Sequence, residues 1–182
     1  DILVGGFPCQ PFSIAGVTKN NSLNLKHGFE HITQGNLFFH IVRILQEKQP
    51  SAFILENVKN LLSHNKKKTF SIINNTLSQE LGYQIYYKVV DASYIVPQKR
   101  QRVFIFGFKP AREFNFPDFI NLNPKAKTIL ETNVPEKYTL SDKLWNYLTG
   151  YADKHKAKGN GFGYGLLDWE WVTRTLSARY YK

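Results

Sequence analysis

Short apolar runs alternate with helical segments along the first 108 residues, and this order limits the folds open to the chain. The runs at 1–4 and 51–55 have the length and composition of buried strands. Between them, apolar residues at helical spacing predict a helix over 36–48, which Pro50 ends. A strand, a helix and a second strand in this order favour two parallel strands joined by a crossover helix. The pattern therefore predicts an α/β fold.

A second helix and two further strands follow. Apolar residues that share one face predict the helix, and Gly82 stands where a left-handed cap is needed. The two strands are predicted at 83–90 and 103–106. Because no helix lies between them, a parallel crossover is disfavoured and we expect antiparallel neighbours. The whole order is that of half of a doubly wound α/β sheet, mostly parallel and ending in an antiparallel strand.

The remainder of the chain, residues 109–182, has a different character. Prolines are scattered through it, hydrophobic periodicity is weak, and a glycine-rich segment covers 159–165. All three tryptophans of the chain lie here. We therefore expect two domains, 1–108 and 109–182, of which the second is a loop-rich module with short strands.

The charge of the chain is strongly positive, with 24 Lys and Arg residues against 14 Asp and Glu and a formal net charge of +10. Such an excess attracts nucleic acid, although a soluble protein with a merely basic surface would show the same composition. No apolar stretch approaches the roughly 18 residues of a membrane span, so we expect no membrane contact. A single cysteine excludes a disulfide framework and a Cys-x-x-Cys zinc site, so we expect no metal and a cytoplasmic protein.

That cysteine, Cys9, follows the first predicted strand in Gly-Gly-Phe-Pro-Cys-Gln-Pro-Phe-Ser, residues 5–13. In open α/β sheets, ligands bind at the carboxyl ends of the strands, which is where this turn is expected. A lone cysteine is more often an inert apolar residue than a nucleophile. Its place on a turn of glycines and prolines at that edge favours the nucleophile.

Three charged residues are expected at the same edge. Glu56 follows the second predicted strand and reaches this edge if the two strands are parallel. Arg100 and Arg102 enter the final strand two residues apart, so in an extended chain they point to one face. A thiol, a carboxyl and a guanidinium together suit covalent catalysis on an electron-poor ring. The simpler interpretations are that Glu56 caps its turn and that the arginines contact phosphate or solvent.

Four segments resemble motifs of the DNA (cytosine-5)-methyltransferases, in the family's order and roughly at its spacing. They are Gly-Phe-Pro-Cys-Gln-Pro-Phe-Ser at 6–13, Gly-Asn-Leu-Phe-Phe at 35–39, Glu-Asn-Val at 56–58 and Pro-Gln-Lys-Arg-Gln-Arg-Val at 97–103. The ordered set is far more specific than any one segment. The resemblance implies that 1–108 are part of a Rossmann-like methyltransferase core and that 109–182 are part of a target recognition region.

The resemblance also implies a mechanism. Cys9, as thiolate, would attack carbon 6 of a cytosine flipped out of duplex DNA. Glu56 would hold or donate a proton at ring nitrogen 3. Arg100 would hydrogen-bond the ring carbonyl oxygen and Arg102 would support the pocket. Carbon 5 would then take the methyl group of S-adenosylmethionine, a base would remove the carbon 5 proton, and Cys9 would leave.

Further residues take binding roles by the same resemblance. Those expected to contact the methyl donor are Pro8 and Leu37, although Leu37 could equally be plain core. Those expected to contact DNA are Gln10, Ser13, Gln98, Arg174 and Arg179. For either of the last two, a scattered backbone contact is as good an interpretation as a base contact. Asn57 is expected to brace the turn at Pro8 and Cys9 through side-chain-to-backbone bonds.

The chain departs from the family in several places. The glycine-rich opening turn, the acidic residue that binds the donor's ribose and the two closing motifs are not found, so most of the donor site is expected outside this chain. His31 stands where relatives usually have Asp, and Lys67 stands where glycine is common. Ile95 replaces the glycine usually found two residues before Pro97. If that position needs a positive φ, a β-branched residue is costly there.

Three functions are open on these observations. The first is methylation of cytosine carbon 5 in a bacterial restriction-modification system. A monomeric cytoplasmic enzyme would act on double-stranded DNA beside a cognate restriction endonuclease. The second is a catalytically incompetent remnant that only binds DNA, or one part of a split enzyme. The third, an unrelated thiol enzyme that pairs Cys9 with a histidine, is disfavoured because no histidine stands beside a predicted strand end.

Overall fold

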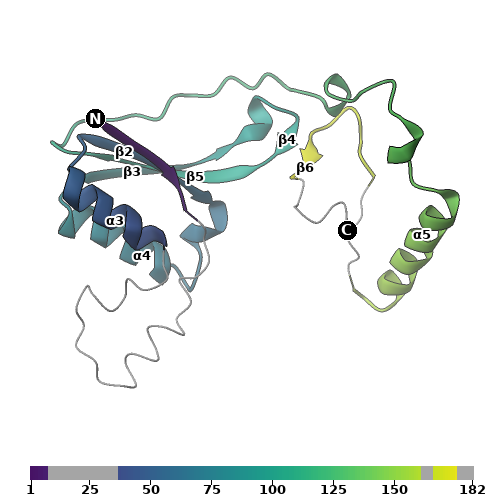
Figure 1. Ribbon diagram of the computed structural model, residues 1–182, viewed down its shortest axis with the longest axis horizontal. Coiled ribbons are helices and arrows are strands. Elements are labelled where there is room, and N and C mark those ends of the chain that lie inside the picture. The colour runs from purple at the N-terminus through teal and green to yellow at the C-terminus, as the bar shows by residue number, and fades with distance from the viewer. Residues whose placement is uncertain (8–36, 161–165, 176–182) are drawn as a thin grey trace. The chain divides into compact units, whose positions relative to one another are not determined.

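The computed structural model of the protein describes residues 1–7, 37–160 and 166–175 (Figure 1). Contacts divide the chain into two compact units, of which the first comprises 1–91 and 101–118 and the second comprises 92–100 and 119–182. Within the described ranges, no helix is both long and apolar enough to cross a membrane.

The first unit is built on a four-stranded sheet. Its strands, in spatial order, are β1 (Ile2–Gly6), β2 (Ala52–Val58), β5 (Gln101–Phe108) and β3 (Gln84–Asp91). β1 and β2 are parallel, whereas β5 is antiparallel to both β2 and β3. Three strands therefore run in one direction and β5 runs in the other, which confirms the predicted α/β sheet with a final antiparallel strand. In space, β5 lies between β2 and β3, an order that the sequence does not predict.

Two helices cover one face of this sheet (Figure 1). α3 spans Leu37–Lys48, and α4 spans Lys68–Asn75 and continues into a π-helical turn at Thr76–Glu80. Apolar residues three and four apart place one stripe of each helix against the strands. The core between them contains Phe38, Val42, Leu45, Phe53, Leu55, Ile73, Leu77, Val103 and Ile105. Gly82 has a φ of 73° after the helical segment, which confirms the predicted left-handed cap.

Residues 109–118 cover part of the opposite face. The ring of Phe114 stacks on that of Phe106 with 4.7 Å between centroids, and it lies 5.7 Å from the ring of Tyr86. The Tyr86 hydroxyl donates a hydrogen bond to the carbonyl oxygen of Arg112 at 3.0 Å. These contacts keep the segment with the first unit, whereas the sequence predicts a boundary after residue 108.

The second unit contains a long helix and a short two-stranded ladder. α5 (Asp142–Ala157) begins after Ser141, whose hydroxyl accepts a hydrogen bond from the N–H of Leu144 at 3.3 Å. The sequence predicts only loops and short strands here, because no residue of α5 is buried and no strong apolar stripe marks it. The short strands β4 (Gln98–Lys99) and β6 (Thr173–Arg174) pair in parallel.

Three consecutive residues before α4 have left-handed backbone conformations. The φ angles of Asn65, Lys66 and Lys67 are 50°, 54° and 70°. A left-handed conformation disfavours residues with a Cβ atom by about 1–2 kcal/mol each. Lys67 therefore occupies a position that suits glycine, the residue that the resemblance leads one to expect there.

Replacing Lys67 by glycine is expected to raise the free energy of unfolding by about 0.5–1 kcal/mol, because relief of the left-handed strain exceeds the entropy that glycine adds to the unfolded chain. Urea denaturation measures the change. The control is Ser71→Gly, at an exposed position inside α4, which should lower the stability by about 0.5 kcal/mol. Equal losses of unfolding free energy in Lys67→Gly and Ser71→Gly would contradict the strain at Lys67.

Ile95 carries no such strain. Its N–H donates to the carbonyl oxygen of Ala92 at 2.9 Å and so continues the preceding 3-10 turn. Among the described residues, positive φ angles of non-glycine residues occur at Gln49, Asn65, Lys66, Lys67 and Asn123. Ile95 therefore has no positive φ, and its replacement of glycine carries no cost of that kind.

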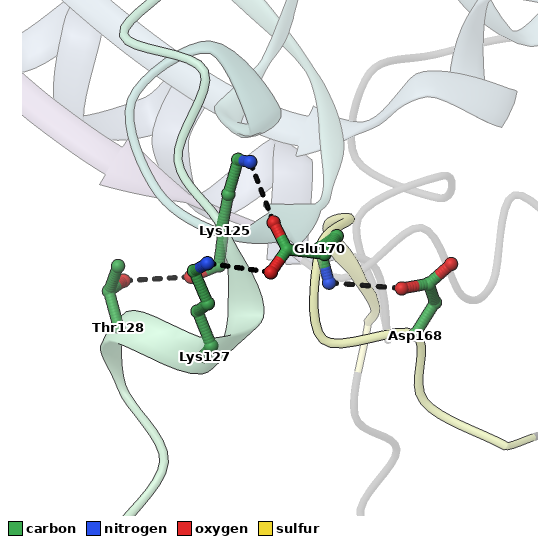
Figure 2. Close-up of polar contacts among 5 residues, drawn as sticks. All are labelled: Lys125, Lys127, Thr128, Asp168 and Glu170. Carbon is green, nitrogen blue, oxygen red and sulfur yellow. Dashed lines mark hydrogen bonds and ion pairs between the residues drawn. The ribbon is translucent and has the colours of Figure 1, made fainter.

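An acidic side chain links two distant segments of the second unit, 125–128 and 168–171 (Figure 2). Glu170 forms ion pairs with Lys125 at 2.7 Å and with Lys127 at 2.6 Å. Its own N–H donates to Oδ1 of Asp168 at 2.9 Å. Backbone hydrogen bonds join the same two segments, so side chains and main chain hold them together.

This link is expected to weaken in acid. Hydrogen bonds from Lys125 and then Lys127 lower the pKa of Glu170 from 4.5 to about 2. Because the folded pKa lies below the unfolded one, the stabilisation is complete above pH 4.5 and is lost as the pH falls through about 2. Thermal unfolding of the wild type and of Glu170→Gln should therefore differ at neutral pH and converge near pH 2.

The difference is expected to be small, because the Glu170 side chain is 52% exposed and water screens its ion pairs. Glu136→Gln is the matched control, since Glu136 lies in the exposed turn Glu136–Tyr138. This substitution should leave the pH dependence of thermal unfolding unchanged. A Glu170→Gln effect of constant size down to pH 2 would show that the carboxylate's charge does not stabilise the link.

Candidate active site at the strand ends

Glu56 and Arg102 form an ion pair at the edge of the sheet where β1 and β2 end and β5 begins. The Arg102 Nε donates to Glu56 Oε1 at 2.8 Å. Arg102 is the register partner of Val58, so the pair is a diagonal contact between neighbouring strands. The Arg102 side chain is 20% exposed and that of Glu56 is 37% exposed. The carboxylate therefore stays accessible while its partner is largely covered.

Glu56 lies inside β2 rather than after it, because this strand continues to Val58. Its carboxylate binds an arginine, so the interpretation of Glu56 as a turn cap is wrong. The predicted convergence of the two parallel strand ends with the start of the antiparallel strand is confirmed for Glu56 and Arg102.

Gly6 leaves room for this carboxylate. It is the register partner of Glu56 on the neighbouring strand β1. A Cβ atom built on Gly6 would lie 3.4 Å from Glu56 Oε2, so this second oxygen lies beside the end of β1. Arg102 thus holds one carboxylate oxygen, and the other faces the strand that leads into Cys9, three positions after Gly6.

Asn57 fixes the end of β1 from the next strand. Its Nδ2 donates to the carbonyl oxygen of Phe7 at 2.7 Å, and its Oδ1 accepts from the N–H of Val58 at 2.8 Å. The side chain is buried, and the ring of Phe7 packs on that of Phe38. A side-chain-to-backbone bond of the predicted kind therefore holds the residue before Pro8.

A polar network that the sequence does not predict adjoins the ion pair. Gln101 Nε2 donates to Asp91 Oδ2 at 2.9 Å, and Gln101 Oε1 accepts from Lys59 Nζ at 3.0 Å. The carbonyl oxygen of Gln101 accepts from Arg102 Nη1 at 2.9 Å. The network therefore reaches Glu56 through the guanidinium of Arg102.

Arg100 and Gln98 belong to the second unit. Arg100 is exposed and lies between β4 and β5, and its carbonyl oxygen accepts from the N–H of Ala92 at 3.1 Å. Because Arg100 is outside a strand, the alternation that would place it on one face with Arg102 does not apply. Gln98 is paired with Thr173 in the short ladder of the second unit.

The remaining predicted site residues have different positions. Leu37 is 52% exposed at the start of α3, so its interpretation as plain core is wrong. Arg174 is exposed in β6. The predictions for Pro8, Cys9, Gln10, Ser13, His31 and Arg179 fall outside the described residues.

The Glu56 carboxylate thus lies beside the Arg102 guanidinium, at the edge where ligands bind in open α/β sheets. A carboxylate with one oxygen held by Arg102, and the other without a polar partner among the described residues, can hold a proton on a polar ring atom. Within the described ranges, no cluster of three or more His, Cys, Asp or Glu side chains could bind a metal ion.

Comparisons with known proteins give the family of the chain. The family model of C-5 cytosine-specific DNA methylases matches residues 1–182. A DNA-cytosine methyltransferase of Escherichia coli (strain K12) is 46% identical over 202 residues, which cover 100% of this chain and 43% of that protein. The type II methyltransferase M.SsoII of Shigella sonnei is 49% identical over 189 residues, which cover 100% of this chain and 47% of that protein.

Solved structures show the same fold. The DNMT2 of Spodoptera frugiperda aligns with a TM-score of 0.56 and 19% identity, over 84% of this chain and 45% of that one. The Entamoeba histolytica methyltransferase EhMeth aligns with a TM-score of 0.53 and 19% identity, over 79% of this chain and 42% of that one. The predicted Rossmann-like methyltransferase fold is confirmed. The chain spans about half the length of the curated relatives it matches. It belongs to the C-5 cytosine-specific DNA methylase family.

Proposed function

We propose that the protein carrying this chain methylates carbon 5 of cytosine in duplex DNA, with Cys9 as the nucleophile. The observation that carries the proposal is the placement of Glu56, which Arg102 holds beside the end of the strand that leads into Cys9. The family membership of the chain supports the same chemistry.

The reaction requires cytosine to become nucleophilic at carbon 5. The Cys9 thiolate forms a bond to carbon 6 of a base flipped out of the helix, and the electron pair of the 5,6 double bond moves into the ring. Glu56 provides a proton at nitrogen 3, so that negative charge does not accumulate there. Once carbon 5 carries the methyl group, its proton passes to a base, the double bond re-forms and the bond to Cys9 breaks.

The arginines and the amide residues serve the base and the DNA. Arg102 orients the Glu56 carboxylate through the 2.8 Å contact. Arg100 is proposed to hydrogen-bond the ring carbonyl oxygen, which helps to select cytosine. Gln10, Ser13, Gln98, Arg174 and Arg179 are proposed to contact DNA. The second unit carries twelve Lys and Arg residues against six Asp and Glu, a balance that favours phosphate contacts.

S-adenosylmethionine, when bound, supplies an electrophilic methyl group. The exposed apolar side chain of Leu37 fits a contact with such a donor. Pro8 is proposed to make a second contact. We propose a restriction-modification role, with a cognate endonuclease acting on the same DNA site.

Incubation with duplex DNA and radiolabelled S-adenosylmethionine, followed by digestion to nucleosides, tests the proposal. The expected product is labelled 5-methylcytosine. Label on an exocyclic nitrogen of cytosine or adenine would overturn it, as would DNA binding without any transfer. The latter result would favour the non-catalytic DNA-binding alternative. Bisulfite sequencing of the product identifies the target site.

A further inference from the structure

Gln101 is the first residue of β5 and lies directly opposite Asp91, the last residue of β3. Its amide donates to the Asp91 carboxylate at 2.9 Å and accepts from the Lys59 ammonium at 3.0 Å. An anion on one side and a cation on the other fix which end of the amide is the donor and which is the acceptor. Neither an acidic nor a basic side chain could make both bonds.

The main chain of Gln101 then holds the ion pair. Its carbonyl oxygen accepts from Arg102 Nη1 at 2.9 Å, while Arg102 Nε donates to Glu56 Oε1 at 2.8 Å. The guanidinium is therefore anchored at two points, one of which is this carbonyl. The position of Glu56 depends on where the first peptide of β5 lies.

The terminal residues of a strand are the least restrained part of it, because the sheet ladder continues on one side only. At this end of β5, the Gln101 side chain ties the strand to β3 through Asp91. It also ties the strand to the turn after β2 through Lys59. These ties restrain the peptide whose carbonyl oxygen anchors Arg102.

We propose that Gln101 is a positioning residue, which acts through Arg102 to hold the Glu56 carboxylate for the chemical step. The inference rests on the proposed function of Glu56. Gln101 stands between Arg100 and Arg102, and the resemblance gives it no role of its own. Gln101 affects the rate of methyl transfer and leaves DNA affinity unchanged.

The test uses variants that change the hydrogen-bonding pattern and preserve the shape. Gln101→Leu removes both side-chain bonds. Gln101→Glu keeps the acceptor for Lys59 but turns a like charge toward Asp91. Adding Asp91→Asn to Gln101→Glu restores the second bond with donor and acceptor exchanged. Asp91→Asn alone and Gln84→Leu, at an exposed position near the other end of β3, are the controls.

Single-turnover methyl transfer at saturating DNA and donor should fall about 10-fold to 100-fold in Gln101→Leu and in Gln101→Glu, because a small misplacement of a catalytic group has effects of this size. The dissociation constant for DNA should stay within about twofold, below the tenfold that 1.4 kcal/mol represents. The double variant should recover most of the rate. The rescue would assign the loss of rate to the hydrogen bond between positions 91 and 101, whereas a general structural defect would also weaken DNA binding.

A second measurement on the same variants does not depend on activity. The ¹⁵N–¹H signal of Arg102 Nε should exchange with water faster in Gln101→Leu and Gln101→Glu than in the wild type, and slowly again in the double variant. An unchanged exchange rate in the single variants overturns the positioning role. So does a rate of methyl transfer equal to that of the wild type. If no protein methylates DNA but the exchange follows the expected order, the positioning of Arg102 holds and the proposed function fails.

Discussion

Replacing Cys9 by serine should lower the single-turnover rate of methyl transfer by at least about 10³-fold, the scale at which loss of a covalent nucleophile is felt. The thiolate is the attacking form of cysteine, and a serine hydroxyl ionises far less readily. Binding of duplex DNA should remain within about threefold, because one atom is exchanged and no phosphate contact is lost. Rapid-quench assays with saturating DNA and S-adenosylmethionine measure the rate, and a gel-shift titration measures the binding.

The two measurements together separate a loss of chemistry from a loss of fold. A serine variant that retains more than about a tenth of the wild-type rate would contradict the assignment of Cys9 as the nucleophile, since tenfold corresponds to only 1.4 kcal/mol. A parallel loss of DNA binding would point to a structural role for the cysteine instead.

Replacing Gly107 by alanine should destabilise the first unit by about 3 kcal/mol, at the upper end of the range for overpacked cores. Gly107 lies in β5, and a Cβ atom built on it would overlap Cε1 and Cζ of Phe53. The Phe53 ring is fully buried and packs on that of Tyr83 with 5.0 Å between centroids. Because the buried ring and a Cβ atom at position 107 cannot both keep their places, the strand or the core must shift. The midpoint of urea unfolding measures the loss.

Gly150→Ala is the matched control for this substitution. Gly150 lies inside α5, and a Cβ atom there would meet nothing within 4 Å. Because alanine is favoured over glycine within a helix, this variant should be more stable by up to about 1 kcal/mol. A loss of unfolding free energy in Gly107→Ala no larger than the change in Gly150→Ala would contradict the close packing of β5 on Phe53.

The sequence predicts the elements of the first unit because local chemistry determines them. No helical segment lies between residues 90 and 103, which disfavours a parallel crossover, and the structure has antiparallel strands there. The position of β5 between β2 and β3 does not follow, because the neighbours of a strand in space depend on long-range pairing. α5 was also beyond prediction, since a helix without buried residues leaves no apolar period in its sequence.

The candidate site likewise has a part that local sequence predicts and a part that depends on long-range strand pairing. The motif that contains Glu56 and the order of the strands predict the edge at which its side chain lies. The supporting contacts depend on register, which pattern alone does not provide. Lys59 and Gln101 are 42 positions apart, and their side chains meet only because β2 and β5 are neighbours. One signal was available for Asp91 and Gln101, because they flank the connection between two strands expected to be antiparallel.

Peptide mapping of a trapped complex tests the central claim most directly. The protein is incubated with S-adenosylmethionine and duplex DNA that carries 5-fluorocytosine at the methylated position. In ordinary cytosine a base removes the hydrogen at carbon 5 as a proton, but a base cannot remove fluorine in this way. The bond from the enzyme to carbon 6 therefore persists after methyl transfer. Protease digestion and mass spectrometry then identify the linked residue. The expected result is a single cross-link at Cys9. A cross-link at another residue, or methylation of ordinary DNA with no trapped complex, would contradict the mechanism.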